Sequence, residues 1–127
     1  MYRTKQVVAT SSAPKPAGPY SQGISAAGFV FVAGQVPINP HSGEVPPGIS
    51  EQTRQCLNNV KSILEAAGST LDNVVRVGVY LRRIEDFAEM NKVYETFFKE
   101  FPPARTTIQC VLAANFLIEI DAVAIKS

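Results

Sequence analysis

The chain has 127 residues, of which 46% are hydrophobic and 18% are charged, and its formal net charge at pH 7 is +1. This length suits one domain, residues 1–127, that buries roughly two-thirds of its unfolded surface. No Lys/Arg cluster is present, so the chain offers no electrostatic footprint for nucleic acid. Its longest apolar run, residues 28–34, is far too short to span a membrane. We therefore predict a globular domain with neither nucleic acid nor a membrane as a partner.

The amino terminus and the cysteines indicate the cytoplasm. Residues 1–6 carry charges but no apolar signal core follows them, so we do not expect secretion. Cys56 lies in a helical pattern and Cys110 in a strand pattern, which favours buried free thiols over a disulfide. The only histidine, His41, lies in a turn-rich loop. One histidine and two widely separated cysteines do not have the ligand spacing of a zinc site.

The predicted elements follow one another in the order β–β–α–β–α–β–β. Strands are expected at residues 5–10, 29–33, 74–81, 105–112 and 118–124. Apolar residues recur every three or four positions over 50–67 and again over 86–101, which predicts two helices; the second includes Phe101 on its buried side. Two helices and five strands predict an α+β two-layer sandwich, with a mixed β-sheet and both helices on one face.

The two C-terminal strands show strict alternation and predict a hairpin that turns at residues 113–116. Apolar residues occupy the even positions of both strands, from Ile108 to Ala124. If the even positions pair, Arg105 and Thr107 share the opposite face with Glu119 and Asp121. Arg105 and Asp121 near the middle of a sheet are our candidate functional pair. The alternative is a structural ion pair with no substrate.

The face of the sheet away from the helices has no predicted cover. Residues 29–32 place apolar side chains on both faces of their strand, yet the sequence predicts no third helix. An apolar sheet face of this size usually marks a protein interface. We therefore expect an oligomer, with the candidate pair at or near the contact.

These residues resemble the YjgF/RidA family, also called the reactive intermediate deaminase family, from about Thr10 to Ile125. The similar segments are Gly18-Pro19-Tyr20-Ser21-Gln22-Gly23, Val32-Ala33-Gly34-Gln35-Val36-Pro37, Gly43-Glu44, Asn58-Asn59-Val60-Lys61, Glu65-Ala66-Ala67-Gly68, Asp86-Phe87 with Asn91 and Tyr94, Pro103-Ala104-Arg105, and Ile118-Glu119-Ile120-Asp121-Ala122-Val123-Ala124. Many separated matches in the same order make a chance similarity a poor explanation.

The resemblance implies a chorismate-mutase-like fold and a homotrimer with its sites in the clefts between subunits. The implied activity is that of a 2-iminobutanoate/2-iminopropanoate deaminase, a hydrolase that removes reactive intermediates of amino-acid metabolism. It would convert 2-imino acids and 2-aminoacrylate-type enamines to 2-keto acids and ammonia. No metal or organic cofactor is implied.

The resemblance also implies roles for particular residues. Arg105 would anchor the substrate carboxylate, because its planar fork makes two parallel charge-assisted hydrogen bonds. Asp121 would orient or activate water. The cleft would be lined by Tyr20, Ala33, Gly34, Asn91 and Thr107. Many family members have Ser in place of Ala33 and Cys in place of Thr107, and most active members have Glu where we align Asp121, which shortens the acid here by one methylene.

Two other functions stay open at this stage. The same fold could bind or sense a small carboxylate such as a 2-keto acid through Arg105, without turnover. It could also be a chaperone-like interaction protein or a ribonuclease, although the neutral charge argues against RNA. Turnover of an imine would distinguish the deaminase from the binding protein and from the chaperone-like protein or ribonuclease.

Overall fold

The computed structural model describes residues 4–126; residues 1–3 and 127 of the predicted domain lie outside the described residues. Within that range the chain forms six strands, two α-helices and two short 3₁₀ turns. In chain order these are β1 (Gln6–Val8), β2 (Gly23–Ala26), β3 (Phe29–Gln35), α1 (Ile49–Ala66), η1 (Leu71–Asn73), β4 (Val74–Leu81), η2 (Ile84–Asp86), α2 (Phe87–Phe97), β5 (Ala104–Gln109) and β6 (Ile118–Ile125). None of the described helices is long and apolar enough to cross a bilayer.

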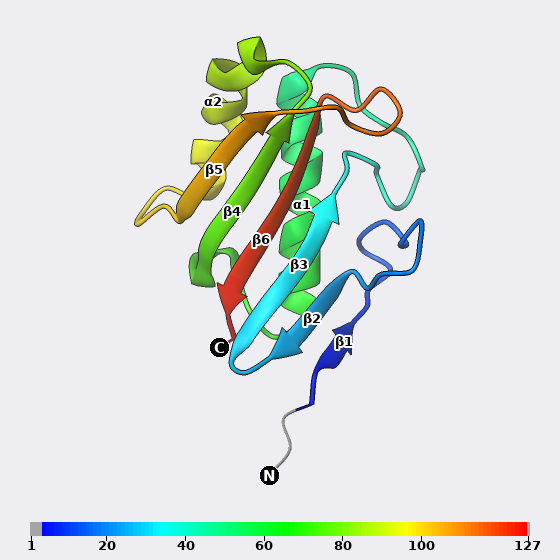
Figure 1. The fold of residues 1–127 in the computed structure, drawn as a ribbon, viewed down its shortest axis with the longest axis vertical. Helices are drawn as coiled ribbons and strands as arrows, with labels where there is room; N and C mark the ends of the chain where they lie inside the picture. The colour runs from blue at the N-terminus through cyan, green and yellow to red at the C-terminus, as the bar shows by residue number, and fades with distance from the viewer. Residues whose placement is uncertain (1–3, 127) are drawn as a thin grey trace.

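All six strands join one mixed sheet in the order β1-β2-β3-β6-β4-β5. Both helices cover the same side of it, and the other side is open (Figure 1). The predicted α+β class, the mixed sheet and the single helical layer are confirmed. The sequence prediction missed β2, a strand of four residues that pairs with β1 and β3.

The predicted C-terminal hairpin is wrong, because β4 lies between its two strands. β5 pairs with β4 in parallel, with Val77 opposite Arg105, and β6 pairs with the other edge of β4 antiparallel, with Val77 opposite Ala122. A parallel pair needs a crossover connection, which α2 supplies. β5 therefore forms an outer edge of the sheet.

The core lies between the helices and one face of the sheet. Along β6, Ile118, Ile120, Ala122 and Ala124 are buried, as the alternation predicts. They pack in the same cluster as the apolar face of α1. Two residues predicted on the buried side of the second helix are exposed instead. Phe87 is 41% exposed, and Phe101, beyond the end of α2 at Phe97, is 94% exposed with φ 49°.

The open face of the sheet carries exposed apolar side chains. In register, Val7 of β1 lies opposite Ile24 of β2, and Ile24 lies opposite Phe31 of β3. Val7 is 66% exposed and Phe31 is 46% exposed. The predicted uncovered apolar face is therefore present in the single chain.

Candidate functional site

A hollow of about 540 Å³ opens beside the ends of β3 and β6. Its lining combines three predicted site residues with one charged residue that was not predicted there, and is otherwise apolar: Ala17, Tyr20, Ala33, Gly34, Val36, Ile38, Ala113, Phe116 and Glu119. We call Tyr20, Ala33, Gly34 and Glu119 the carboxylate cluster.

The absence of a side chain at Gly34 makes room for the Glu119 carboxylate. The pairing of β3 with β6 shifts register between Val32 and Gln35, so Gly34 lies at an irregularity of the ladder. A Cβ atom built on Gly34 would overlap a carboxylate oxygen of Glu119. The carboxylate therefore lies directly against the backbone of β3, in the space that a side chain on residue 34 would take.

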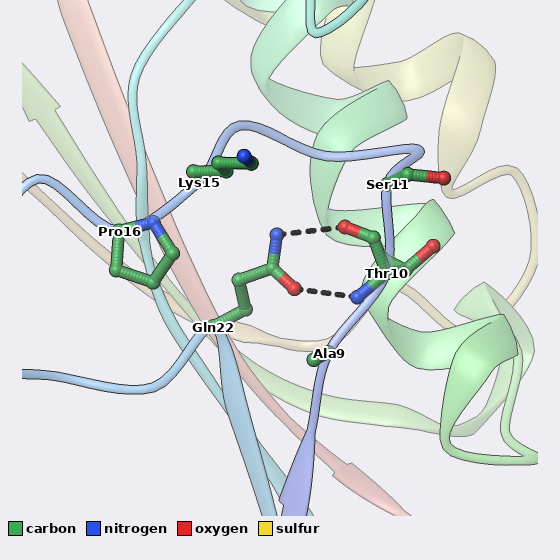
Figure 2. Close-up of a pocket in the computed structure, with 6 residues that line it drawn as sticks. All are labelled: Ala9, Thr10, Ser11, Lys15, Pro16 and Gln22. Atoms are coloured by element: carbon green, nitrogen blue, oxygen red, sulfur yellow. Dashed lines mark hydrogen bonds between the residues drawn. The ribbon is translucent and has the colours of Figure 1, made fainter.

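Gln22 fixes the loop that brings Tyr20 to the hollow. Its side-chain oxygen accepts a hydrogen bond from the Thr10 N–H at 2.7 Å, and its amide donates to the Thr10 carbonyl at 3.0 Å (Figure 2). The same amide donates to the carbonyls of Ala13 and Pro14. Tyr20 itself stays half-exposed, and its hydroxyl accepts a hydrogen bond from the Ala17 N–H at 3.1 Å.

Glu119 is partly buried and its carboxylate has no hydrogen-bond or ion-pair partner within residues 4–126. Burial raises the pKa of Glu119, and the negative charge of Asp121 raises it further. Such a shift is common for carboxyl groups that exchange protons during catalysis.

Asp121 has a different environment, although it lies on the same face of β6. One carboxylate oxygen accepts a hydrogen bond from the Gly78 N–H at 3.0 Å, and the other accepts one from the Tyr80 hydroxyl at 2.8 Å. That bond raises the pKa of Tyr80, because the neutral phenol is the donor. Asp121 is not among the residues that line the hollow.

Arg105 lies on the other side of the sheet. Because it pairs with Val77, it points toward the helical layer. Its guanidinium carbon lies 4.6 Å from the ring centroid of Tyr94 and 5.6 Å from that of Phe87, both in cation–π range. No carboxylate in the described part of the chain forms an ion pair with Arg105.

Two further predicted residues lie on the same side as Arg105. Thr107 follows it by two residues in β5, and its hydroxyl is buried without a hydrogen-bond partner among the described residues. Asn91 is half-buried and occupies the face of α2 that also carries Phe87 and Tyr94, at helical spacings of four and three. We call Arg105, Thr107 and Asn91 the arginine cluster.

The predicted site residues therefore form two clusters on opposite sides of the sheet. The prediction that Arg105 and Asp121 share a face is wrong. β4 lies between their strands, and its Val77 is opposite both Arg105 and Ala122, so Arg105 shares a face with Ala122 and not with Asp121. The sequence analysis missed Glu119 and Phe116 as lining residues. The alternation of β6 already placed Glu119 on the face of Asp121, but only the neighbouring strands show which carboxylate is free.

Comparison with known proteins shows the family of this chain. A family model described as endoribonuclease L-PSP matches residues 10–126. A RutC family protein of Pyrococcus horikoshii is 52% identical over 124 residues, which cover 96% of this chain and 98% of that protein. The chain belongs to the YjgF/RidA family.

Two other relatives within the YjgF/RidA family bear on the chemistry. The 2-iminobutanoate/2-iminopropanoate deaminase of Escherichia coli K12 is 40% identical over 125 residues, covering 95% of this chain and 98% of that protein. The crystal structure of E. coli TdcF with bound serine superposes with a TM-score of 0.93 at 36% identity, covering 96% of this chain and 99% of that chain. The resemblance predicted from the sequence, and the YjgF/RidA-like fold, are confirmed.

Proposed function

We propose that this protein is a hydrolytic deaminase of 2-imino acids and their enamine tautomers, releasing 2-keto acids and ammonia. The observation that carries the proposal is the pair of incomplete clusters. Among residues 4–126, the Glu119 carboxylate has no cation beside it, and the Arg105 guanidinium has no carboxylate beside it. A 2-imino acid needs both, since it has a carboxylate next to an electrophilic carbon. The E. coli relative at 40% identity, named for this activity, supports the same chemistry.

The two clusters would meet between copies of the chain. They lie on opposite faces of one sheet, so one chain cannot place both on one small substrate. The exposed apolar face with Val7 and Phe31 is a surface that a second copy would cover. A head-to-tail contact repeated around a closed ring sets the carboxylate cluster of one copy against the arginine cluster of the next. The ring of three implied by the family resemblance gives three such sites.

Arg105 would bind the substrate carboxylate with two parallel hydrogen bonds and so fix the adjacent C=N carbon. The unpartnered Thr107 hydroxyl can donate to the same carboxylate, and Asn91 lies beside it to orient the substrate. Tyr20 at the rim of the hollow would limit access of bulk water.

Glu119 would take the role first predicted for Asp121. Its free carboxylate accepts a proton from a water molecule as the water oxygen bonds to the C=N carbon. The proton then passes to the nitrogen to give a carbinolamine. Glu119 transfers the hydroxyl proton of this carbinolamine to the nitrogen as well, so the C–N bond breaks, ammonia leaves and the C=O bond of the 2-keto acid forms. Because both oxygens of Asp121 already accept hydrogen bonds, its shorter side chain has no bearing on this step.

The test is a coupled assay in which an amino-acid oxidase generates the imine and its disappearance is followed. We expect the wild type to accelerate hydrolysis. Arg105→Ala and Glu119→Gln should each lose about 10²-fold or more, in the range that a positioned base or anchor contributes. Asp121→Asn should keep most of the activity.

Three outcomes would contradict this assignment. If Glu119→Gln stays fully active, or if Asp121→Asn loses as much as Glu119→Gln, Glu119 does not have the proposed role. If the wild type leaves the imine as stable as the no-enzyme control while calorimetry shows 2-keto acid binding through Arg105, the protein is a binding or sensing protein.

A further inference from the structure

The guanidinium of Arg82 holds the loop that connects β5 to β6, residues 110–117. Arg82 directly follows β4, and its Nε donates a hydrogen bond to the Phe116 carbonyl at 2.7 Å. One Nη atom donates to the carbonyls of Leu112 and Ala114, both at 2.8 Å. The Arg82 backbone N–H also donates to the Leu117 carbonyl. One residue therefore contacts the loop at four carbonyls.

The loop needs such support, since its backbone is locally unfavourable. Ala114 has φ 49°, in the left-handed region that residues with a Cβ seldom adopt. A planar guanidinium presents several donors in fixed directions, which the single ammonium of lysine cannot reproduce. Gln52 of α1 adds a second tether, because its side-chain oxygen accepts a hydrogen bond from the Leu117 N–H at 2.9 Å.

The loop forms one wall of the hollow that contains Glu119. It supplies Ala113 and Phe116, while Val36 and Ile38 belong to the segment that follows β3. In the proposed reaction Arg105 of a second copy holds the substrate carboxylate and Glu119 faces the reacting carbon. The apolar remainder of the hollow is then left for the side chain of the substrate.

We propose that Arg82 is a positioning residue that fixes this wall, and that the wall selects 2-imino acids with branched apolar side chains, of the kind derived from leucine, over short ones. The inference rests on the function proposed above and deepens it. It assigns Phe116 to the specificity of the site, and Arg82 to the placement of Phe116.

The experiment compares two imines generated by an amino-acid oxidase, one from leucine and one from alanine. The wild type should have the higher kcat/KM for the leucine-derived imine. Arg82→Gln should raise KM for that imine about 10-fold, as the loss of an apolar pocket contact does. The same variant should change the KM for the alanine-derived imine less than about twofold. Arg82→Lys should restore the preference only in part.

Arg83→Gln is the matched control. Arg83 is the adjacent arginine, its side chain is 61% exposed, and its described bond is to Asp86 at 3.4 Å, so it does not contact the loop. Its kinetics should match the wild type. Phe116→Ala removes the wall directly and should abolish the same preference even if Arg82→Gln proves too unstable to assay.

The results that overturn the inference differ from those that overturn the deaminase proposal. An active wild type with no preference for the leucine-derived imine, or an Arg82→Gln variant that affects both imines equally, defeats the inference alone. If neither imine is hydrolysed, the deaminase proposal fails. Calorimetry with the two corresponding 2-keto acids, 4-methyl-2-oxopentanoate and pyruvate, then tests the role of Arg82. The wild type should bind 4-methyl-2-oxopentanoate more tightly than pyruvate, and Arg82→Gln and Phe116→Ala should each lose this difference in affinity.

Discussion

Glu119 and Asp121 show how two carboxylates, two residues apart on one strand, acquire different chemistry. Asp121 accepts hydrogen bonds from the Gly78 N–H and the Tyr80 hydroxyl, so both of its carboxylate oxygens have donors. Glu119 accepts no hydrogen bond from the part of the chain that the structure describes. Its burial, and then the nearby charge of Asp121, raise its pKa. Pairs of groups whose environments differ in this way often divide the acid and base roles of a site.

The influence of Asp121 on Glu119 gives a testable pH dependence. The proposed base must be ionised, so kcat should fall as the pH drops through the pKa of Glu119. Asp121→Asn removes a neighbouring negative charge and lowers the pKa of Glu119. The acid limb of the kcat profile should therefore move to lower pH in this variant.

The control for that shift is Asp72→Asn, which removes an exposed carboxylate in η1, before β4. It should leave the acid limb in place. Arg105 of the second copy is present in both proteins, so the difference reports the charge of Asp121. A shift to higher pH, or an equal shift in Asp72→Asn, would contradict the assignment of Glu119 as the base.

At the scale of elements, the irregular pairing of β3 with β6 positions the carboxylate cluster. The register shift between Val32 and Gln35 brings the backbone of Gly34 against the Glu119 side chain. A methyl group at this position meets the end of a flexible side chain, so the side chain is displaced while the strands stay paired.

Gly34→Ala should therefore reduce activity much more than stability. A displacement of the carboxylate by about 1 Å predicts a loss of about 10²-fold in kcat. Steady-state kinetics together with a thermal melt check this prediction. A variant with normal kcat, or one that loses activity only because it unfolds, would show that the close approach of Gly34 to Glu119 is not functional.

Elements with strong local patterns could be predicted from the sequence. The periodicity of α1 and the alternation of β6 identify their buried faces, because each depends on spacing within one segment. β2 was missed because four residues, two of them Gly23 and Ser25, give too short a pattern. Phe101 was misplaced because helical spacing alone does not show where α2 ends.

The pairing of β5 could not be predicted from its own residues. Ile108 alternates with polar neighbours as a core residue would, yet it is 44% exposed and lies on the open face beside Tyr80. Its apolar pattern fits the proposed contact with another copy instead of the core of its own chain. For the same reason, the sequence analysis named candidate site residues around Gly34 and around Arg105 but did not show that they lie in two separate clusters.

At the scale of the whole molecule, the proposed ring of copies accounts for both the exposed apolar face of the sheet and the separation of the carboxylate cluster from the arginine cluster. A sheet with helices on one side leaves its other side apolar and exposed. β5 is an edge strand, so Arg105 is available to a neighbouring copy, while Glu119 lies two strands further into the sheet. A ring of copies would cover the apolar face and complete each site with residues of two chains.

The central claim is that each site combines Glu119 of one chain with Arg105 of another. The most direct test is co-expression of Glu119→Gln and Arg105→Ala chains with different tags, followed by isolation of oligomers that contain both. Each variant alone should be nearly inactive. In a ring of three, each isolated mixed oligomer should have about a third of the wild-type sites, since the only intact site joins Glu119 of an Arg105→Ala chain to Arg105 of a Glu119→Gln chain. Mixed oligomers as inactive as either parent would contradict the claim that the two clusters meet between chains.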